Sequence, residues 1–409
     1  MLSPLMITQK DDDLLGVANR SDAMGLLAVW SDRARDLVPH LTQQTTNVRG
    51  FQILVEAFRL WEAYEPAHPE HAGRLDDFFL VVEQAFARVV GRNDRDWPLP
   101  GARRVKARSQ EKVRVSVADL DWHLLGGQLA NGIWGIYRGA ARRAGLLEDN
   151  MSRLALETME AASARPGLGA GAEKMLFAFA EEAMNGATVP LQTELDDELA
   201  GDLFSTFHDV PLTQHFYDLL IEADPLNLAL ASRLREVENL DHRRFLLEAA
   251  QDLPEHRDAL ENVIRCEDLL GVVESIFLWV CASKGESLEA AVADLPVDLE
   301  ALEAARVQFG NSGFYRGDTA SARQRRLYEL LETSSPLVLA RSVLELHRRV
   351  SEERKRAAWV WEESGILRGD VDVAKPSEAD LRVGYVWRND YYLQSLRSIA
   401  RQLTGGSVE

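Results

Sequence analysis

Apolar residues recur with helical spacing along most of this chain, and few segments show the strict alternation that a half-buried strand requires. Two early stretches show apolar stripes at i, i+3, i+4 and i+7, as expected for the core-facing sides of amphipathic helices. Their members are Phe51, Leu54, Val55, Phe58, Trp61, Leu75, Phe78, Phe79, Val82, Phe86 and Val89. The pattern therefore predicts an all-α protein, mainly α and built from many helices.

Residue types that favour helix ends mark several boundaries. Thr46 precedes the first stripe and is a candidate N-cap, because a threonine oxygen accepts unpaired N–H groups of the first turn. Gly145 is expected to end a helix in the left-handed conformation. Ser335 followed by Pro336 predicts the start of another long helix, with serine as the cap and proline at its first position.

Breaks in the apolar pattern divide the chain into four regions. A loop or hairpin arm with Pro98 and Pro100 follows the second stripe. The unit after this arm has the pattern of a helix-turn-helix or winged helix, and a generic helical hairpin explains it equally well. The predicted domains are an N-terminal helical domain (1–90), the basic arm with the turn unit (91–165), an acidic helical domain (166–308) and a C-terminal helical region (309–409).

Composition and charge fit a globular protein. Among 409 residues, 46% are hydrophobic and 27% are charged, with a net charge of −19. The acidity is concentrated between Glu148 and Glu303, and the flanking segments are mildly basic. No secretory signal or transmembrane segment is recognisable. Cys266 and Cys281 lie fifteen positions apart in one expected helix, too far to pair, which favours reduced thiols in the cytoplasm.

No catalytic motif is recognisable, so we predict no catalytic residue and no cofactor. The glycine-rich run 167–174 ends in Lys174 but lacks the Gly-Lys-Ser/Thr order of a phosphate-binding loop. The run 310–313 lacks the spacing of a nucleophile elbow. Glu353 and Lys355 have a spacing found in nucleases, but a solvated helix face explains them as well.

The histidines do not indicate a metal site either. His68 and His71 lie near Glu65 and Glu70, yet a proline-containing connection holds them and no further cluster has zinc-like spacing. His208 and His215 flank Pro211 without a third ligand nearby. We therefore predict no metal.

Basic residues are the most informative chemistry in the sequence. Between Arg88 and Arg114, nine basic residues face only three acidic ones. Guanidinium groups bind phosphates in a bidentate fork, so this arm and the unit after it are candidates for nucleic-acid contact. The alternatives are that the arm docks on the acidic region or that its charges only provide solubility. The candidate nucleic-acid-binding residues are Arg103, Arg104, Lys106, Arg108, Lys112, Arg114, Arg138, Arg142 and Arg143.

Three segments resemble uncharacterised helical proteins of bacterial anti-phage defence islands. The segment 385–403 resembles their closing helix, although Val48-Arg49-Gly50-Phe51 departs from their arginine–aromatic pair. The remaining matching residues are Leu15, Gly16, Pro39, Leu41, Thr42, Thr45, Phe51, Gly132, Gly135, Tyr137, Arg143, Gly145 and Leu146. The resemblance implies an accessory or scaffold role in a defence system.

These observations lead to one hypothesis and two alternatives. The hypothesis is a non-catalytic subunit of a bacterial defence or DNA-processing complex, with other protein subunits as partners of its acidic region and DNA as a candidate partner of its basic arm. The first alternative is a metal-dependent nuclease whose ligands meet only in the fold. The second is a stand-alone DNA-binding regulator. No membrane partner is expected.

Overall fold

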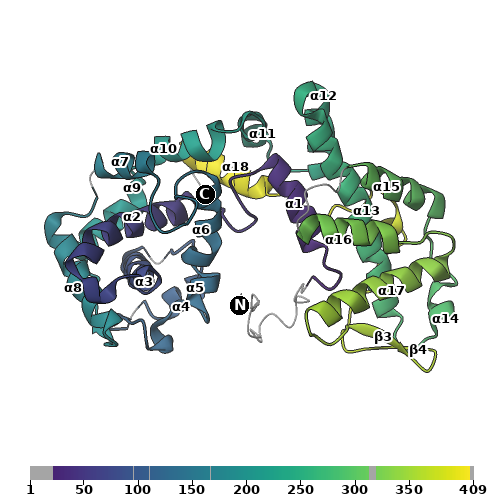
Figure 1. Cartoon of the computed structure of the whole chain (residues 1–409), viewed down its shortest axis with the longest axis horizontal. Helices are drawn as coiled ribbons and strands as arrows, with labels where there is room; N and C mark the ends of the chain where they lie inside the picture. Colours follow the sequence, from purple (N-terminus) through teal and green to yellow (C-terminus); the bar gives the residue numbers. More distant parts are fainter. Residues whose placement is uncertain (1–21, 95, 110, 166, 313–318, 406–409) are drawn as a thin grey trace. The chain divides into compact units, whose positions relative to one another are not determined.

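The computed structural model describes residues 22–94, 96–109, 111–165, 167–312 and 319–405 (Figure 1). The protein is 63% helical, which confirms the prediction of a mainly α, multi-helix fold. Among the described residues, strands form two small antiparallel sheets, β1 with β2 and β3 with β4. None of the described helices combines the length and the apolar character needed to cross a bilayer. The residues Leu15 and Gly16 lie outside the described ranges.

The chain divides into two compact units, which we call unit 1 and unit 2. Unit 1 contains residues 38–238 and the described residues from Tyr392 onward. Its elements are α2 (Val48–Tyr64), α3 (Leu75–Asn93), α4 (Ala102–Ala107), β1 (Arg114–Val115), α5 (Gln128–Asn131), α6 (Ile133–Arg143), α7 (Leu156–Ser163), α8 (Ala170–Met184), β2 (Val189–Pro190), α9 (Glu198–Asp209), α10 (Thr213–Tyr217), α11 (Pro225–Glu236) and α18 (Leu393–Leu403).

The two predicted apolar stripes form the core of unit 1. The stripe residues of α2 and α3 are buried, apart from Leu75 at the first position of α3. Helix α3 packs against α2, α8 and α9, and α6 contacts α2 (Figure 1). Helices α2 and α3 are buried over nearly their whole circumference. Helix α3 therefore also buries the polar side chains of Glu83, Gln84 and Arg88.

The last helix of the chain closes the N-terminal end of α2. Asn47 caps α2 by accepting a hydrogen bond from the backbone N–H of Arg49 at 3.0 Å, so the predicted cap, Thr46, is wrong by one position. The carbonyl of Thr46 instead accepts a bond from Gln402 of α18, whose side-chain oxygen in turn accepts from the N–H of Val48. Helix α18 is therefore an integral part of unit 1.

Unit 2 is organised around one long helix, α13. It contains the described residues up to Leu37 and residues 239–391. Helix α13 contacts α1, α12, α15 and α17 (Figure 1). The elements of unit 2 are α1 (Leu27–Leu37), α12 (His242–Asp252), α13 (Arg257–Ala282), α14 (Leu288–Val292), α15 (Leu299–Asn311), α16 (Thr319–Leu330), α17 (Pro336–Glu353), β3 (Val360–Glu363) and β4 (Ile366–Gly369).

Local predictions in unit 2 agree with the structure. The Ser335 side chain accepts a hydrogen bond from the N–H of Val338 at 3.3 Å, so Ser335 caps α17 as predicted. Both cysteines lie on α13, are buried and form no disulfide. Burial raises the pKa of the Cys266 and Cys281 thiols to about 12. Neutral thiols in apolar surroundings behave as packing groups rather than nucleophiles.

The division into units differs from the four consecutive domains that the sequence predicts. Unit 1 combines residues 38–90 of the predicted N-terminal domain, the segment 91–165 and part of the acidic region with the final helix α18. Unit 2 takes α1 from the N-terminal part and joins it to α13. Breaks in periodicity mark the ends of helices, but they do not reveal which helices share a core.

The turn unit expected within 91–165 has a longer connection than a helix-turn-helix. Gly145 ends α6 with φ +79°, as predicted. The chain then makes an antiparallel bridge between Leu147 and Leu154 before α7 begins, and α7 packs against α2. Twelve residues, 144–155, thus separate α6 from α7, whereas a helix-turn-helix uses a turn of about three to four.

Candidate nucleic-acid interface

A row of polar side chains on α3 forms hydrogen bonds with Ser109 and with the segment 111–123. Gln84, Arg88 and Arg92 are spaced four residues apart and therefore share one face of the helix. Gln84 is paired with both backbone groups of Ser116 at 2.9 and 3.0 Å. Arg88 Nη2 donates to the carbonyl of Trp122 at 2.9 Å, and Arg92 donates to the carbonyl of Ser109 at 2.6 Å.

The basic arm is partly helical rather than a loop. Helix α4 packs against α3 at Gly91, where an added Cβ would lie 2.0 Å from Cγ1 of Val105. Val105 is buried, and its neighbours in α4 face solvent. A helix of six residues with one apolar contact has too little periodicity to be recognised in the sequence.

Backbone pairing connects the arm to the acidic region. Strand β1 pairs with β2 through Val115 and Val189, and the N–H of Leu191 donates to the carbonyl of Val113 at 2.9 Å. The main chain of the arm thus pairs with one short strand of the acidic region, and docking through the basic side chains stays a prediction. The exposed basic side chains of the arm do not take part in this pairing.

Two predicted arginines of the arm also contribute to the fold. Arg104 donates to the carbonyl of His123 at 3.0 Å while much of its side chain stays exposed. The guanidinium carbon of Arg108 lies 4.7 Å from the centre of the Trp122 ring, a cation–π distance. Arg108 is also 4.0 Å from the carboxylate of Glu111. Each guanidinium retains further N–H donors, because arginine carries five.

The other arm residues of the prediction face solvent. Arg103, Lys106, Lys112 and Arg114 are all exposed. The side chains of Lys106, Lys112 and Arg114 form no hydrogen bond or ion pair with any described group. Residues 101–115 carry six basic side chains and one acidic one, so the arm is a strongly positive surface on an acidic protein.

The structure does not bring the predicted residues of α6 to the arm. Arg143 donates to the carbonyls of Pro39 and Leu41 at 2.8 and 3.2 Å, which connects α6 to the segment before α2. Arg138 lies 4.3 Å from the Trp134 ring and donates to the carbonyl of Met151 at 2.8 Å. Both therefore act as packing residues. Arg142 alone is exposed, and it lies at the C-terminal end of α6.

Arg88 is the residue that the sequence prediction left out of the candidate site. Its side chain is 2% exposed, and its Nε and Nη1 atoms have no hydrogen-bond partner among the described residues. Burial, together with the positive charges of Arg108 and Arg104, lowers the pKa of Arg88 to about 10, and Glu111 opposes this shift. The sequence did contain a sign of this role, because Arg88 is one of the polar residues within the apolar stripe of α3. Buried polar residues at such positions require a hydrogen-bond partner.

The histidine cluster near the end of α2 is a weak candidate for a metal site. Ligand atoms of His68, Glu70 and His71 lie within 4.8 Å of one another. Both ring nitrogens of His71 are engaged, because Nδ1 is 2.8 Å from the Tyr64 hydroxyl and Nε2 is 3.2 Å from Oδ1 of Asn185. A metal would have to displace one of these bonds, so the arrangement favours a structural role.

The remaining candidates take on structural contacts. His208 lies 3.5 Å from Asp94, and His215 lies 3.0 Å from the Thr158 hydroxyl, so these two histidines do not share ligands. Glu353 forms an ion pair with Arg326 of α16. Glu353 thus lies on a helix face next to solvent, as the sequence analysis allowed, and it also has a partner on the neighbouring helix.

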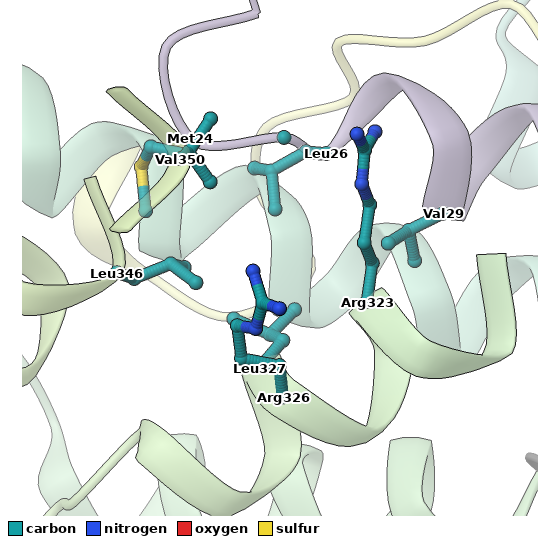
Figure 2. A pocket seen from close by; sticks show the side chains of 9 residues that line it. Met24, Leu26, Val29, Arg323, Arg326, Leu327, Leu346 and Val350 are labelled. Carbon is teal, nitrogen blue, oxygen red and sulfur yellow. The ribbon is translucent and has the colours of Figure 1, made fainter. Parts of the chain in front are cut away.

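One hollow in each unit was a candidate for a ligand site, and one is too small while the other is open. In unit 2, a pocket is lined by Arg323 and Arg326 of α16, by Met24 and Leu26, and by side chains of α17 (Figure 2). This pocket has room for about one water molecule, with a volume of about 10 Å³. A hollow of about 400 Å³ in unit 1 lies beside His68 and is lined mainly by α8. Neither has the enclosed shape and converging polar groups of a small-molecule site.

Comparison with known proteins provides no family for this fold. No protein-family model, curated protein or solved structure matches the chain.

Proposed function

We propose that this protein is a cytoplasmic, non-catalytic subunit of a bacterial defence or DNA-processing complex, and that its basic arm binds the phosphate backbone of nucleic acid. The observation that carries the nucleic-acid part is the outward orientation of Lys106, Lys112 and Arg114 beside the exposed Arg103 and Arg104. The defence context rests on the sequence resemblance, and the other subunits are its expected protein partners.

Electrostatics support the arm as the contact surface. The chain carries a net charge of −19, so a polyanion is repelled by most of its surface and attracted where positive charges cluster. Trp122 is half-buried beside Arg108, and an aromatic ring next to arginines is a common feature of surfaces that bind single strands. Backbone contacts of this kind confer affinity without sequence specificity.

The salt dependence of binding tests this function. Fluorescence anisotropy with duplex DNA, single-stranded DNA and RNA at several salt concentrations gives the slope of log K against log salt. For duplex DNA each phosphate contact contributes about −0.9 to this slope. Replacing Lys106, Lys112 and Arg114 together by alanine should flatten the slope by about three units. The fold should hardly change, because these side chains make no described contact.

A second triple variant provides the control. Arg153, Lys174 and Arg235 are exposed basic residues of unit 1 outside the arm. Their replacement by alanine changes the net charge by the same amount, so it should leave the slope nearly unchanged. Equal slopes in the wild type and the arm variant would exclude the arm from nucleic-acid binding.

A nuclease is the alternative that the same preparation can test. Cleavage of the labelled strands by the pure protein in Mg²⁺, abolished by substitution of one carboxylate, would replace the scaffold function. Unchanged strands after incubation with Mg²⁺ or Mn²⁺ are the expected result.

A further inference from the structure

Three arginines of unit 1 contact the neighbouring residues Trp122 and His123. Arg88 reaches the Trp122 carbonyl from α3, and Arg104 reaches the His123 carbonyl from α4. Arg108 covers the Trp122 ring. The three guanidinium groups are therefore brought together by one short segment, and we call this group the arginine cluster.

The arginine cluster has more positive charge than its surroundings neutralise. The charged groups that act on Arg88 are Arg108, Glu111 and Arg104, two cations and one carboxylate. Glu111 is 53% exposed and lies at 4.0 Å from Arg108, so its charge is largely shared with solvent. With a pKa of about 10, Arg88 still carries its charge at neutral pH.

Two buried N–H-bearing atoms of Arg88 lack a partner in the part of the chain that the structure describes. Its side chain is 2% exposed, and neither Nε nor Nη1 has a hydrogen-bond partner among the described residues. A buried cation without a counter-ion is unfavourable unless another group pairs with it. An anion with several acceptor oxygens would satisfy these donors and offset the repulsion among the three arginines.

We propose that Arg88, Arg104 and Arg108 form a binding site for a phosphoryl oxyanion, with Arg88 as its buried base. Arg104 is exposed and Arg108 is 30% exposed, so both side chains have room to swing outward and admit the anion. The anion is either inorganic phosphate or a phosphate of a nucleic-acid strand. Only the second source rests on the function proposed above, because binding of the free ion does not depend on it.

Thermal unfolding of the full chain tests the site. The melting temperature is measured in sodium phosphate and in sodium chloride at equal ionic strength and pH. Ligand that binds the folded state alone raises the melting temperature, so phosphate should stabilise the wild type beyond chloride. Arg88→Met removes the buried charge and should abolish this difference. Arg153→Met, the same change at an exposed position of unit 1, should retain it.

Calorimetric titration with inorganic phosphate provides a second measurement. Arg88→Lys keeps the positive charge but lacks the paired N–H donors of the guanidinium group. This variant replaces Arg88→Met in the test if Arg88→Met does not fold. It should bind phosphate about tenfold more weakly than the wild type, as expected for the loss of one charge-assisted bond. The proposal is overturned if phosphate has no effect beyond chloride, or if the Arg88 variants respond as the wild type does.

Oligonucleotides with and without a 5′-phosphate distinguish the two sources. Tighter binding of the phosphorylated strand, lost in the Arg88 variants, identifies a strand-borne terminal phosphate. Equal binding of both strands that the Arg88 variants do not weaken, together with a response to inorganic phosphate, identifies the free ion. If the wild type binds neither strand but still responds to inorganic phosphate, the proposed nucleic-acid function is contradicted. The phosphate site at the arginine cluster is then still supported.

Discussion

The Tyr391 hydroxyl donates a hydrogen bond of 2.8 Å to Oε2 of Glu267, and both side chains are fully buried in unit 2. Glu267 also accepts from the backbone N–H groups of Arg388 and Asn389 and from the Asn389 side chain. Burial raises the pKa of Glu267, while these hydrogen bonds oppose the shift. One carboxyl on α13 thus fixes the segment that precedes α18.

Glu267→Ala should destabilise unit 2 strongly, because it leaves several buried donors unpaired. A loss on the order of 4 kcal/mol is expected from unpaired groups and the cavity. Urea denaturation followed by circular dichroism measures it. Glu274→Gln is the matched control, since Glu274 is part-exposed and pairs with Arg388 at 3.5 Å. It should cost under about 1 kcal/mol, and equal effects of the two variants would contradict the role of Glu267.

Glu83 predicts a pH dependence in unit 1. Complete burial raises the pKa of Glu83 from 4.5 to about 7, although Gln128 and the N–H of Ile133 donate to it. Between these two pH values the folded protein holds a proton that the unfolded chain has released. The free energy of unfolding should therefore fall as the pH rises from about 4.5 to 7 because of this group, by on the order of 3 kcal/mol.

The variant Glu83→Gln isolates this contribution, because glutamine does not titrate. Its stability relative to the wild type should increase with pH across the same interval. Urea denaturation at several pH values provides the comparison. A difference between variant and wild type that does not change with pH would show that Glu83 does not titrate in this range.

Gly50 permits the close approach of α6 to α2. An added Cβ would lie 2.3 to 2.7 Å from the ring of Tyr137, which is 1% exposed and packs edge-on against Phe51. Gly50→Ala should therefore cost about 2–3 kcal/mol of stability. Gly139 of α6 has only Arg143 near its Cβ position, at 3.7 Å. Gly139→Ala should instead stabilise by about 0.5–1 kcal/mol, so a thermal melt of both variants should show shifts of opposite sign.

The hydrogen bonds of His71 predict that substitutions of His71 and Tyr64 have coupled effects on stability. They also predict that zinc does not change the melting temperature. Tyr64→Phe and His71→Ala should each destabilise unit 1, by about 1–3 kcal/mol, and the double variant should cost less than their sum. Since both ring nitrogens are engaged, added zinc should not raise the melting temperature. A zinc-dependent increase that disappears in His68→Ala would instead identify a metal site.

The sequence by itself determined the features that depend on neighbours within one or two helical turns. The stripes of α2 and α3, the cap at Ser335 and the left-handed end at Gly145 follow from periodicity and backbone preference. The cap at Thr46 was misplaced by one residue, because Thr46 and Asn47 both have suitable side chains and the contact with Gln402 of α18 distinguishes them. The positive charge of the arm was equally evident, since charge needs no fold to be counted.

Tertiary structure alone decided which of these charges face solvent and which hold the fold together. Arg143 pairs with carbonyls about one hundred residues away, and Arg88 lies beneath a segment more than thirty residues later. Glu267 meets its partners across more than 120 residues. A buried polar group selects its partner by position in the folded core, and sequence periodicity carries no information on contacts at that separation.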